Sequence, residues 1–220
     1  MKTTLFLSLV MGGILMAQQP EPSASYALGA QIGSDLKKND IAINLDEYIQ
    51  GMKDALKGQL AFSDAACEAA IRKFQDEYRQ KMMAKQLQVA ETNKTEGAAF
   101  LAANKTKTGV MTLPSGLQYK VLKEGTGSSP KSSDRVKVHY TGKLLDGTVF
   151  DSSVQRGQPA TFGVTQVIKG WTEALLKMKP GSKWELYIPA DLAYGANGAP
   201  GGKIGPNATL IFEVELLEIQ

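Results

Sequence analysis

The spacing of apolar residues changes once along this chain, and that change constrains the fold more than any other feature. Up to about residue 104, apolar side chains recur every three or four residues, which is the period of an amphipathic helix. After Thr112 they alternate with polar side chains, as in a strand with one buried face. The sequence therefore predicts a helical N-terminal part followed by an antiparallel α+β domain.

Two short helices are predicted first. Residues 25–38 form one, with Ser25 as its expected N-cap. Asn44 is expected to cap the second helix and to form a capping box with Glu47. Gly58 stands where that helix needs a residue in the left-handed conformation to end.

A third and much longer helix opens at Ser63-Asp64, and Gly97 with residues 98–107 is predicted to be its frayed end and a hinge. A helix of about 30 residues is about 45 Å long, which exceeds the width of a small domain. Its apolar stripe therefore needs a partner, and a second copy of the chain would supply one in a homodimer. The alternative is that Met82 and Met83 belong to a methionine-lined surface for client polypeptides.

The second half of the chain predicts several short strands, one short helix and turns rich in Gly and Pro. Asp146-Gly147 is a two-residue hairpin signal between two of the strands. The expected strands cover residues 117–122, 135–145, 148–150, 183–189 and 209–219, and the helix covers residues 170–178. Together they predict an antiparallel sheet wrapped over a short helix, an α+β unit of about 100 residues.

The composition excludes several classes of chemistry. The single cysteine, Cys67, cannot form an intramolecular disulfide or a cysteine zinc cluster. The single histidine, His139, cannot build a multi-histidine metal site, and its place on the polar face of a predicted strand favours an exposed structural role over a catalytic one. A net charge of +3 indicates no nucleic-acid partner. We expect neither a metal nor a cofactor.

The N-terminus has the layout of a secretory signal peptide. Lys2 is followed by the apolar run Leu5–Met16 and by the small residue Ala17, so residues 1–17 are the expected signal and residues 18–24 a linker. The alternative is an uncleaved helix that is buried or anchors the chain. Because no cysteine for a lipid anchor lies nearby, we expect a periplasmic or secreted protein.

Three Asn-x-Thr triplets begin at Asn93, Asn104 and Asn207. Such triplets are weak indicators of glycan acceptors. Asn93 falls in a predicted helix, and Asn207 falls beside a Gly- and Pro-rich loop. We interpret all three as chance occurrences.

Five blocks of the second half stand in an order that resembles FKBP-type peptidyl-prolyl cis-trans isomerases. They are Val138–Gly142, Gly147–Ser153, Val167–Trp171, Ala193–Gly195 and Thr209–Leu216. The resemblance covers residues 113–220. The helical half resembles the dimerising region of the exported bacterial branch related to the macrophage infectivity potentiator. This implies a dimerisation domain over residues 25–110 with a long connecting helix, and an FKBP-like isomerase domain over residues 111–220.

The resemblance also implies a pocket for a proline ring. Trp171 would form its floor, and the Ile168 N–H and the Tyr194 hydroxyl would donate to substrate carbonyls. The implied catalytic residues are Tyr140, Phe150, Asp151, Tyr194 and Phe212, and the implied substrate-binding residues are Arg156, Phe162, Val167, Ile168, Trp171 and Ile204. Ala160 stands where many members have an aromatic wall, which would weaken a possible macrolide ligand more than peptide turnover.

Such a pocket would act on unfolded or proline-containing polypeptides. Twisting an X–Pro amide makes it less polar, so an apolar pocket favours the twisted form without a nucleophile, metal or cofactor. Asp151 would orient Tyr140 and Arg156 and would not transfer protons. Two alternatives remain: a dimeric holdase chaperone with incidental isomerase activity, and an interaction module with a fixed partner.

Overall fold

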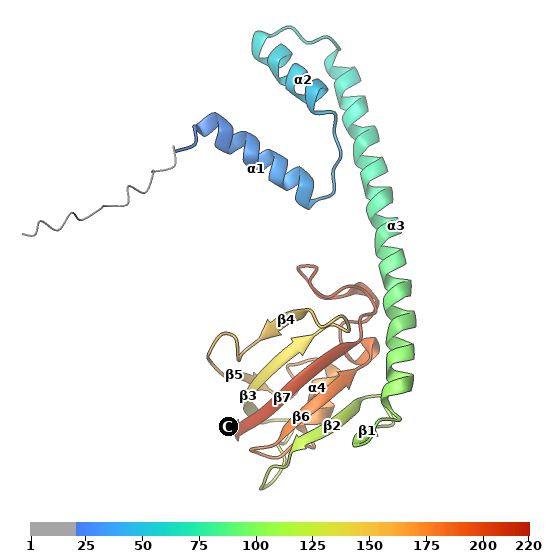
Figure 1. Ribbon diagram of the computed structural model, residues 1–220, viewed down its shortest axis with the longest axis vertical. Helices are drawn as coiled ribbons and strands as arrows, with labels where there is room; N and C mark the ends of the chain where they lie inside the picture. Colours follow the sequence, from blue (N-terminus) through green and yellow to red (C-terminus); the bar gives the residue numbers. More distant parts are fainter. Residues whose placement is uncertain (1–20) are drawn as a thin grey trace, which may run out of the picture. The chain divides into compact units, whose positions relative to one another are not determined.

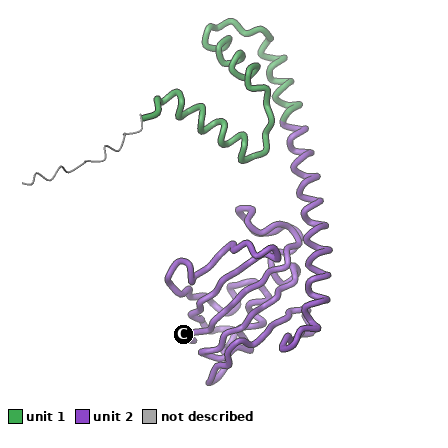
Figure 2. Tube along the Cα trace, in the orientation of Figure 1, with its two compact units in different colours: residues 1–74 green, residues 75–220 purple. Residues whose placement is uncertain are grey.

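The computed structural model describes residues 21–220, so the predicted signal peptide lies outside the described residues. The chain divides into two compact units, residues 1–74 and residues 75–220 (Figure 2). Each unit is described by itself below. Over residues 21–220, no helix has a stretch sufficiently long and apolar to cross a bilayer.

The first unit contains α1 (Ala24–Lys38), α2 (Leu45–Lys57) and the beginning of α3 (Asp64–Asn104). The prediction that Ser25 caps α1 is wrong, because Ser25 already lies inside the helix. Ser23 is the N-cap: its backbone is extended (φ −64°, ψ 153°), and its side chain accepts a hydrogen bond from the Tyr26 N–H at 3.2 Å. An N-cap needs this extended backbone so that its oxygen can reach a free N–H of the first turn.

The predicted ends of α2 are confirmed. The Asn44 side chain accepts hydrogen bonds from the N–H groups of Asp46 and Glu47, at 3.1 and 3.3 Å. The predicted capping box differs in one respect: Glu47 accepts a hydrogen bond from the Asn44 side-chain amide, at 3.1 Å, in place of the Asn44 backbone N–H. Gly58 ends the helix in the left-handed conformation, with φ 68°. No residue of α1 or α2 is buried.

The second unit is built around an antiparallel sheet, wrapped over α4 (Lys169–Leu175) (Figure 1). Its strands within the described residues are β1 (Val110–Thr112), β2 (Gln118–Lys123), β3 (Arg135–Lys143), β4 (Val149–Ser152), β5 (Ala160–Gly163), β6 (Lys183–Ile188) and β7 (Leu210–Ile219). Their order is β1-β2-β6-β7-β3-β4, with β5 also paired to β3. Two short 3-10 turns, η1 (Ala190–Leu192) and η2 (Gly195–Asn197), precede β7.

Strand β3 organises the sheet. One edge pairs with β7 along most of its length, and the other edge pairs with β5 in its first half and with β4 in its second. The predicted alternation holds, because Val136, Val138 and Tyr140 are buried toward α4. From the helix, Trp171 and Leu175 complete this core. The predicted fold class is therefore confirmed.

The sequence analysis did not predict two of the strands. β1 has three residues and β5 has four, so neither is long enough to show an alternating pattern. Both form because longer neighbours offer them a pairing edge: β1 pairs with β2, and β5 with β3. Tertiary pairing, and not local preference, makes these segments strands.

The expectation of a frayed end and hinge after Gly97 is wrong, because α3 continues to Asn104. Gly97 is buried at the point where the helix meets Thr209, and a Cβ added there would overlap the Thr209 hydroxyl. Asn104 is fully buried and donates to the Gln118 side chain at 3.0 Å. The Gln118 amide in turn donates to the Leu101 carbonyl at 2.8 Å. The last turns of α3 are thus part of the second unit's core.

We predict that Gly97→Ala destabilises the second unit by about 1–3 kcal/mol, the usual cost of overpacking a close contact. Helix propensity alone predicts the opposite, a gain of about 1 kcal/mol. Urea unfolding followed by tryptophan fluorescence reports this unit, because both tryptophans, Trp171 and Trp184, lie in it. In a Thr209→Ala background most of the loss should disappear, since the overlapping hydroxyl is gone. A gain in stability from Gly97→Ala alone would contradict the prediction.

Candidate active site

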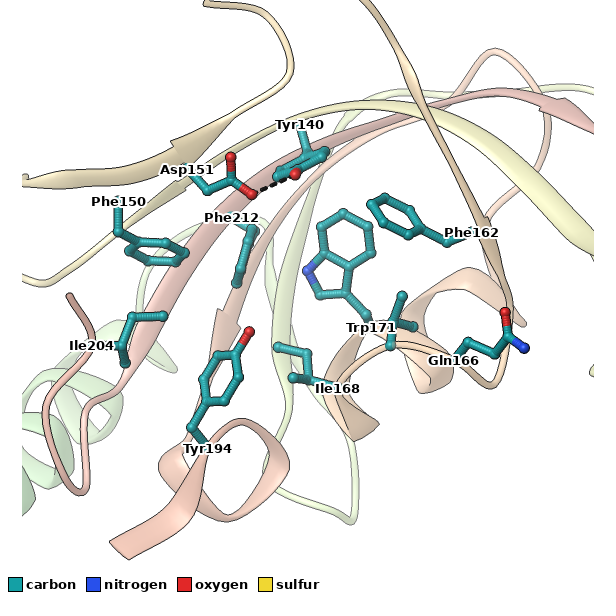
Figure 3. Close-up of a pocket in the computed structure, with 11 residues that line it drawn as sticks. Tyr140, Phe150, Asp151, Phe162, Gln166, Ile168, Trp171, Tyr194, Ile204 and Phe212 are labelled. Atoms are coloured by element: carbon teal, nitrogen blue, oxygen red, sulfur yellow. Dashed lines mark hydrogen bonds between the residues drawn. The ribbon is translucent and has the colours of Figure 1, made fainter. Parts of the chain in front are cut away.

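A cavity of about 480 Å³ opens where α4 approaches β3, β4, β5 and β7 (Figure 3). The residues that line it are Tyr140, Phe150, Asp151, Phe162, Gln166, Val167, Ile168, Trp171, Tyr194, Ile204 and Phe212. Its size is in the range of sites that bind small ligands or a single side chain with its neighbours. The structure thus brings together every predicted site residue except Arg156, which reaches the cavity wall through Asp151 and Tyr140.

Trp171 forms the floor of the cavity. It lies in the first turn of α4, and only 4% of its surface is exposed. Its indole meets Tyr140 and Phe212 edge-on at ring distances of 5.2 Å each, and Phe162 at 5.9 Å. This is the geometry that aromatic rings prefer, because the positive edge of one ring faces the negative face of another.

Phe150 and Phe212 form a second wall, with their rings perpendicular and 5.4 Å apart. Gly142 on β3 makes this wall possible: a Cβ there would lie 2.6 Å from both rings. Only glycine allows the two rings to lie this close to the strand. The cavity is therefore apolar on several sides.

Asp151, Tyr140 and Arg156 form a closed polar group at the rim. The Tyr140 hydroxyl donates to Asp151 at 2.5 Å, Arg156 pairs with the other carboxylate oxygen, and Arg156 Nη2 donates to the Tyr140 oxygen at 3.0 Å. Burial would raise the pKa of Asp151, but the hydrogen bonds from Tyr140 and Arg156 outweigh it and lower that pKa. Burial and the hydrogen bond to Asp151 raise the pKa of Tyr140. Asp151 stays ionised and Tyr140 protonated near neutral pH.

Two residues that line the cavity on its other side carry groups that can donate hydrogen bonds. Ile168 is the N-cap of α4 (φ −59°, ψ 150°), so its backbone N–H is not needed by the hydrogen bonds of the helix. Tyr194 immediately precedes η2, 39% of it is exposed, and its hydroxyl points toward the rings of the cavity (Figure 3). Both residues line the cavity, and each carries a hydrogen-bond donor.

Ile204 closes one side of the cavity. It is carried by the loop between η2 and β7, and only 5% of it is exposed. The loop folds back on itself, because the Ala199 N–H donates to the Ile204 carbonyl at 2.9 Å. The predicted place of Ile204 on an overhanging loop agrees with this geometry.

Two protein families match the chain. Residues 21–121 match the domain amino-terminal to FKBP-type peptidyl-prolyl isomerase, and residues 126–217 match FKBP-type peptidyl-prolyl cis-trans isomerase. Over 197 residues the chain is 50% identical to Outer membrane protein MIP of Legionella longbeachae, covering 89% of this chain and 84% of the relative. It is 46% identical over 221 residues to peptidyl-prolyl cis-trans isomerase Mip of Coxiella burnetii, covering 98% and 96%.

The chain belongs to the FKBP-type peptidyl-prolyl cis-trans isomerases. A solved structure, FkpA from Escherichia coli, is similar to it with a TM-score of 0.73 and 39% identity, covering 89% of this chain and 94% of that one. The predicted family is thus confirmed, and with it the isomerase activity.

The sequence analysis missed one lining residue of the isomerase pocket. Gln166 lies in the turn between β5 and α4, where its N–H donates to the Gly163 carbonyl at 2.9 Å. Its position directly before Val167 was the available signal. Ala160 does not line the cavity, whereas Phe162, two residues further along β5, does and contacts Trp171 and Tyr140.

His139 does not line the isomerase cavity. Its Nδ1 lies 3.1 Å from the Ser153 hydroxyl oxygen, which also accepts the Tyr140 N–H at 2.8 Å. His139 is therefore part of the frame that holds β3 near the start of the 153–157 turn. In the part of the chain that the structure describes, no three His, Cys, Asp or Glu side chains are grouped as a metal site would require.

We predict that kcat/KM on a peptide without titrating groups is constant from about pH 5 to about pH 9. Asp151 has a lowered pKa and Tyr140 a raised one, so neither group changes charge in this interval. The measurement is isomerisation of such a peptide across buffers of constant ionic strength. An inflection within this interval would contradict the proposed orienting role of Asp151.

Proposed function

We propose that this isomerase assists the folding of exported polypeptides by twisting X–Pro amides in the cavity above Trp171, without a cofactor or covalent intermediate. The observation that carries the proposal is a cavity lined mostly by aromatic and aliphatic side chains, with the Tyr194 hydroxyl pointing toward its rings. An X–Pro amide isomerises over a barrier of about 18–20 kcal/mol, in tens of seconds unaided. A thousandfold acceleration requires about 4 kcal/mol of this barrier.

The apolar cavity supplies part of that energy because a planar amide is more polar than a twisted one. Water stabilises the planar form, and transfer into the cavity removes this preference. The Ile168 N–H and the Tyr194 hydroxyl would hold the substrate carbonyls while the amide rotates. Asp151 would keep Tyr140 and Arg156 in place at the rim, which the three hydrogen bonds among them support.

The same proposal places the protein in the periplasm or outside the cell. The apolar run Leu5–Met16 and Ala17 support a cleaved signal peptide. One relative bears the name outer membrane protein, which supports a location in the cell envelope. The expected substrates are unfolded, proline-containing polypeptides.

The proposed roles predict graded losses of activity. Tyr194→Phe removes one hydrogen bond and should lower kcat/KM about three- to tenfold, whereas Asp151→Ala frees both of its partners and should lower it at least about tenfold. The measurement is cis–trans isomerisation of a short proline peptide. Tyr119→Phe is the matched control, because Tyr119 stacks on Trp184 away from the cavity. Unchanged turnover in both pocket variants would contradict these roles.

A macrolide that fills the same cavity belongs to this proposal as a competitor of the peptide. Phe162 supports it by providing a wall where Ala160 does not. Competitive inhibition, with KM rising and kcat unchanged, is the expected pattern. Noncompetitive inhibition would place the macrolide elsewhere.

We also propose that the helical unit joins two copies of the chain. α2 carries an apolar stripe that remains exposed, with Leu45 61%, Met52 44% and Leu56 89% exposed. Burying one such side chain stabilises an assembly by about 1.5–3 kcal/mol. The match of residues 21–121 to the domain that precedes FKBP isomerases supports an assembly role for this unit.

The dimer proposal predicts that Met52→Glu shifts the protein to a monomer at micromolar concentration, because it places a charge in the buried stripe. Light scattering coupled to gel filtration measures the mass. Lys53→Glu is the control: it changes charge on the same helix but off the stripe, and should leave the dimer intact. Turnover of a short peptide should not change in either variant. A Met52→Glu protein that remains dimeric would contradict the proposal.

The alternative is a holdase chaperone in which turnover is incidental. Met83 and Leu87, 59% and 70% exposed on α3, favour it as a flexible apolar surface for clients. The Asp151→Ala variant separates the two functions in the full chain. A holdase role requires that this variant still suppress aggregation of an unfolded client while peptide isomerisation is lost.

A further inference from the structure

The loop that carries Ile204 over the isomerase cavity is tied to helix α3. The Asn93 side-chain amide donates to the Pro206 carbonyl at 2.7 Å. In the reverse direction, the Asn207 side-chain amide donates to the Ala90 carbonyl at 3.3 Å. These two hydrogen bonds join adjacent turns of α3 to adjacent residues of the loop, immediately after Ile204 and Gly205.

Asn207 extends this connection to the other side of the cavity. Its backbone N–H donates to the Gly195 carbonyl at 2.9 Å, and Gly195 directly follows Tyr194. Its φ of 54° lies in the left-handed region, which asparagine adopts more easily than most residues. One residue therefore connects helix α3 with the segments that carry both Ile204 and Tyr194.

The loop also touches the helix directly beside these hydrogen bonds. The Cβ position of Gly205 lies 3.3 Å from Asn93 Nδ2 and from Val89 Cγ1, so helix and loop touch there. Beside this contact lies a hollow of about 310 Å³, lined by Glu96 of the helix, by Leu144–Asp146 and by residues of the loop. Because this hollow lies between helix and loop, the two amide hydrogen bonds are direct links across a face that is only partly filled by side chains.

The asparagines of the three Asn-x-Thr triplets have a structural role. The amides of Asn93, Asn104 and Asn207 all donate between α3 and the rest of the second unit. Each amide is thus engaged within the fold. The three asparagines form polar contacts along the surface where α3 meets the rest of the second unit.

We propose that Asn93 and Asn207 are positioning residues of the isomerase, which act through the loop to hold Ile204 against the bound proline. The inference rests on the proposed function of the cavity. The two side-chain hydrogen bonds of Asn93 and Asn207 are called the clamp below. When the clamp is present, the loop is ordered before substrate binds. When it is absent, each substrate must order the loop itself, and that cost appears as weaker binding. The clamp therefore affects KM more than kcat.

The first test compares Asn93→Asp, Asn93→Ala and Lys94→Ala on a short proline peptide. Aspartate has the shape of asparagine but turns an oxygen toward the Pro206 carbonyl in place of the donor. Both Asn93 variants should lower kcat/KM about fivefold, mainly through KM, as expected for the loss of one hydrogen bond. Lys94→Ala, an exposed neighbour on the same helix, should match the wild type.

The second test places Asn93→Asp in an Ile204→Ala background. If Asn93 acts through Ile204, the loss it causes should shrink to less than about twofold, because coupled residues are not additive. In addition, amide hydrogen exchange in Asn93→Asp should accelerate over residues 198–208 while β3 and β7 stay protected. A merely structural role would raise exchange throughout the unit and leave KM unchanged.

Three results would overturn the inference. They are an unchanged KM in both Asn93 variants, a fivefold loss that persists in full without Ile204, and unchanged exchange in the loop. If the wild type itself fails to accelerate isomerisation, the proposed function fails. The exchange experiment then still tests the clamp, because it requires no turnover.

Discussion

The contact of Trp171 with the sheet is the interaction on which the rest of this structure depends. Its indole meets Tyr140, Phe162 and Phe212, which come from three different strands, β3, β5 and β7. Each such pair contributes about 0.5–1.5 kcal/mol beyond the area it buries. The packing that fixes α4 on the sheet is therefore also the floor of the candidate active site. Substitutions of these rings must change stability and activity together.

The polar group at the rim is connected to this aromatic floor through one residue. Tyr140 belongs to both, since its ring packs on Trp171 and its hydroxyl donates to Asp151. The pKa values of Asp151 and Tyr140 move in opposite directions, so the pair is held in one charge state. Such a group does not exchange protons with a substrate near neutral pH. It can, however, hold the Tyr140 ring, which lines the cavity, in a fixed position. That suits a reaction in which an amide rotates and no proton moves.

Much of the fold could be predicted because long strands and well-formed caps show local signals. β3 and β7 have nine and ten residues, enough for alternation to appear, and Asn44 and Gly58 have the chemistry that helix ends require. The site could be predicted only from the order of its motifs, because a single buried aromatic is more often an ordinary core residue. Gln166 had only its position beside Val167 as a signal, because a polar residue in a turn is typical of many loops.

The end of α3 could not be predicted, and the reason is physical. Asn93, Gly97, Phe100 and Asn104 recur every three or four residues and form the helix face that meets the second unit. Of these four, only Phe100, whose ring lies 5.9 Å from that of Tyr187, is apolar, so the hydrophobic period is weak on this face. Asparagine and glycine are also weak helix formers, glycine by about 1 kcal/mol relative to alanine. Local preference therefore predicts a hinge in this segment. In the structure, close packing and amide hydrogen bonds stabilise a helix there. A segment that looks like a connector is thereby bound to the isomerase unit, and its side chains reach the loop over the active site.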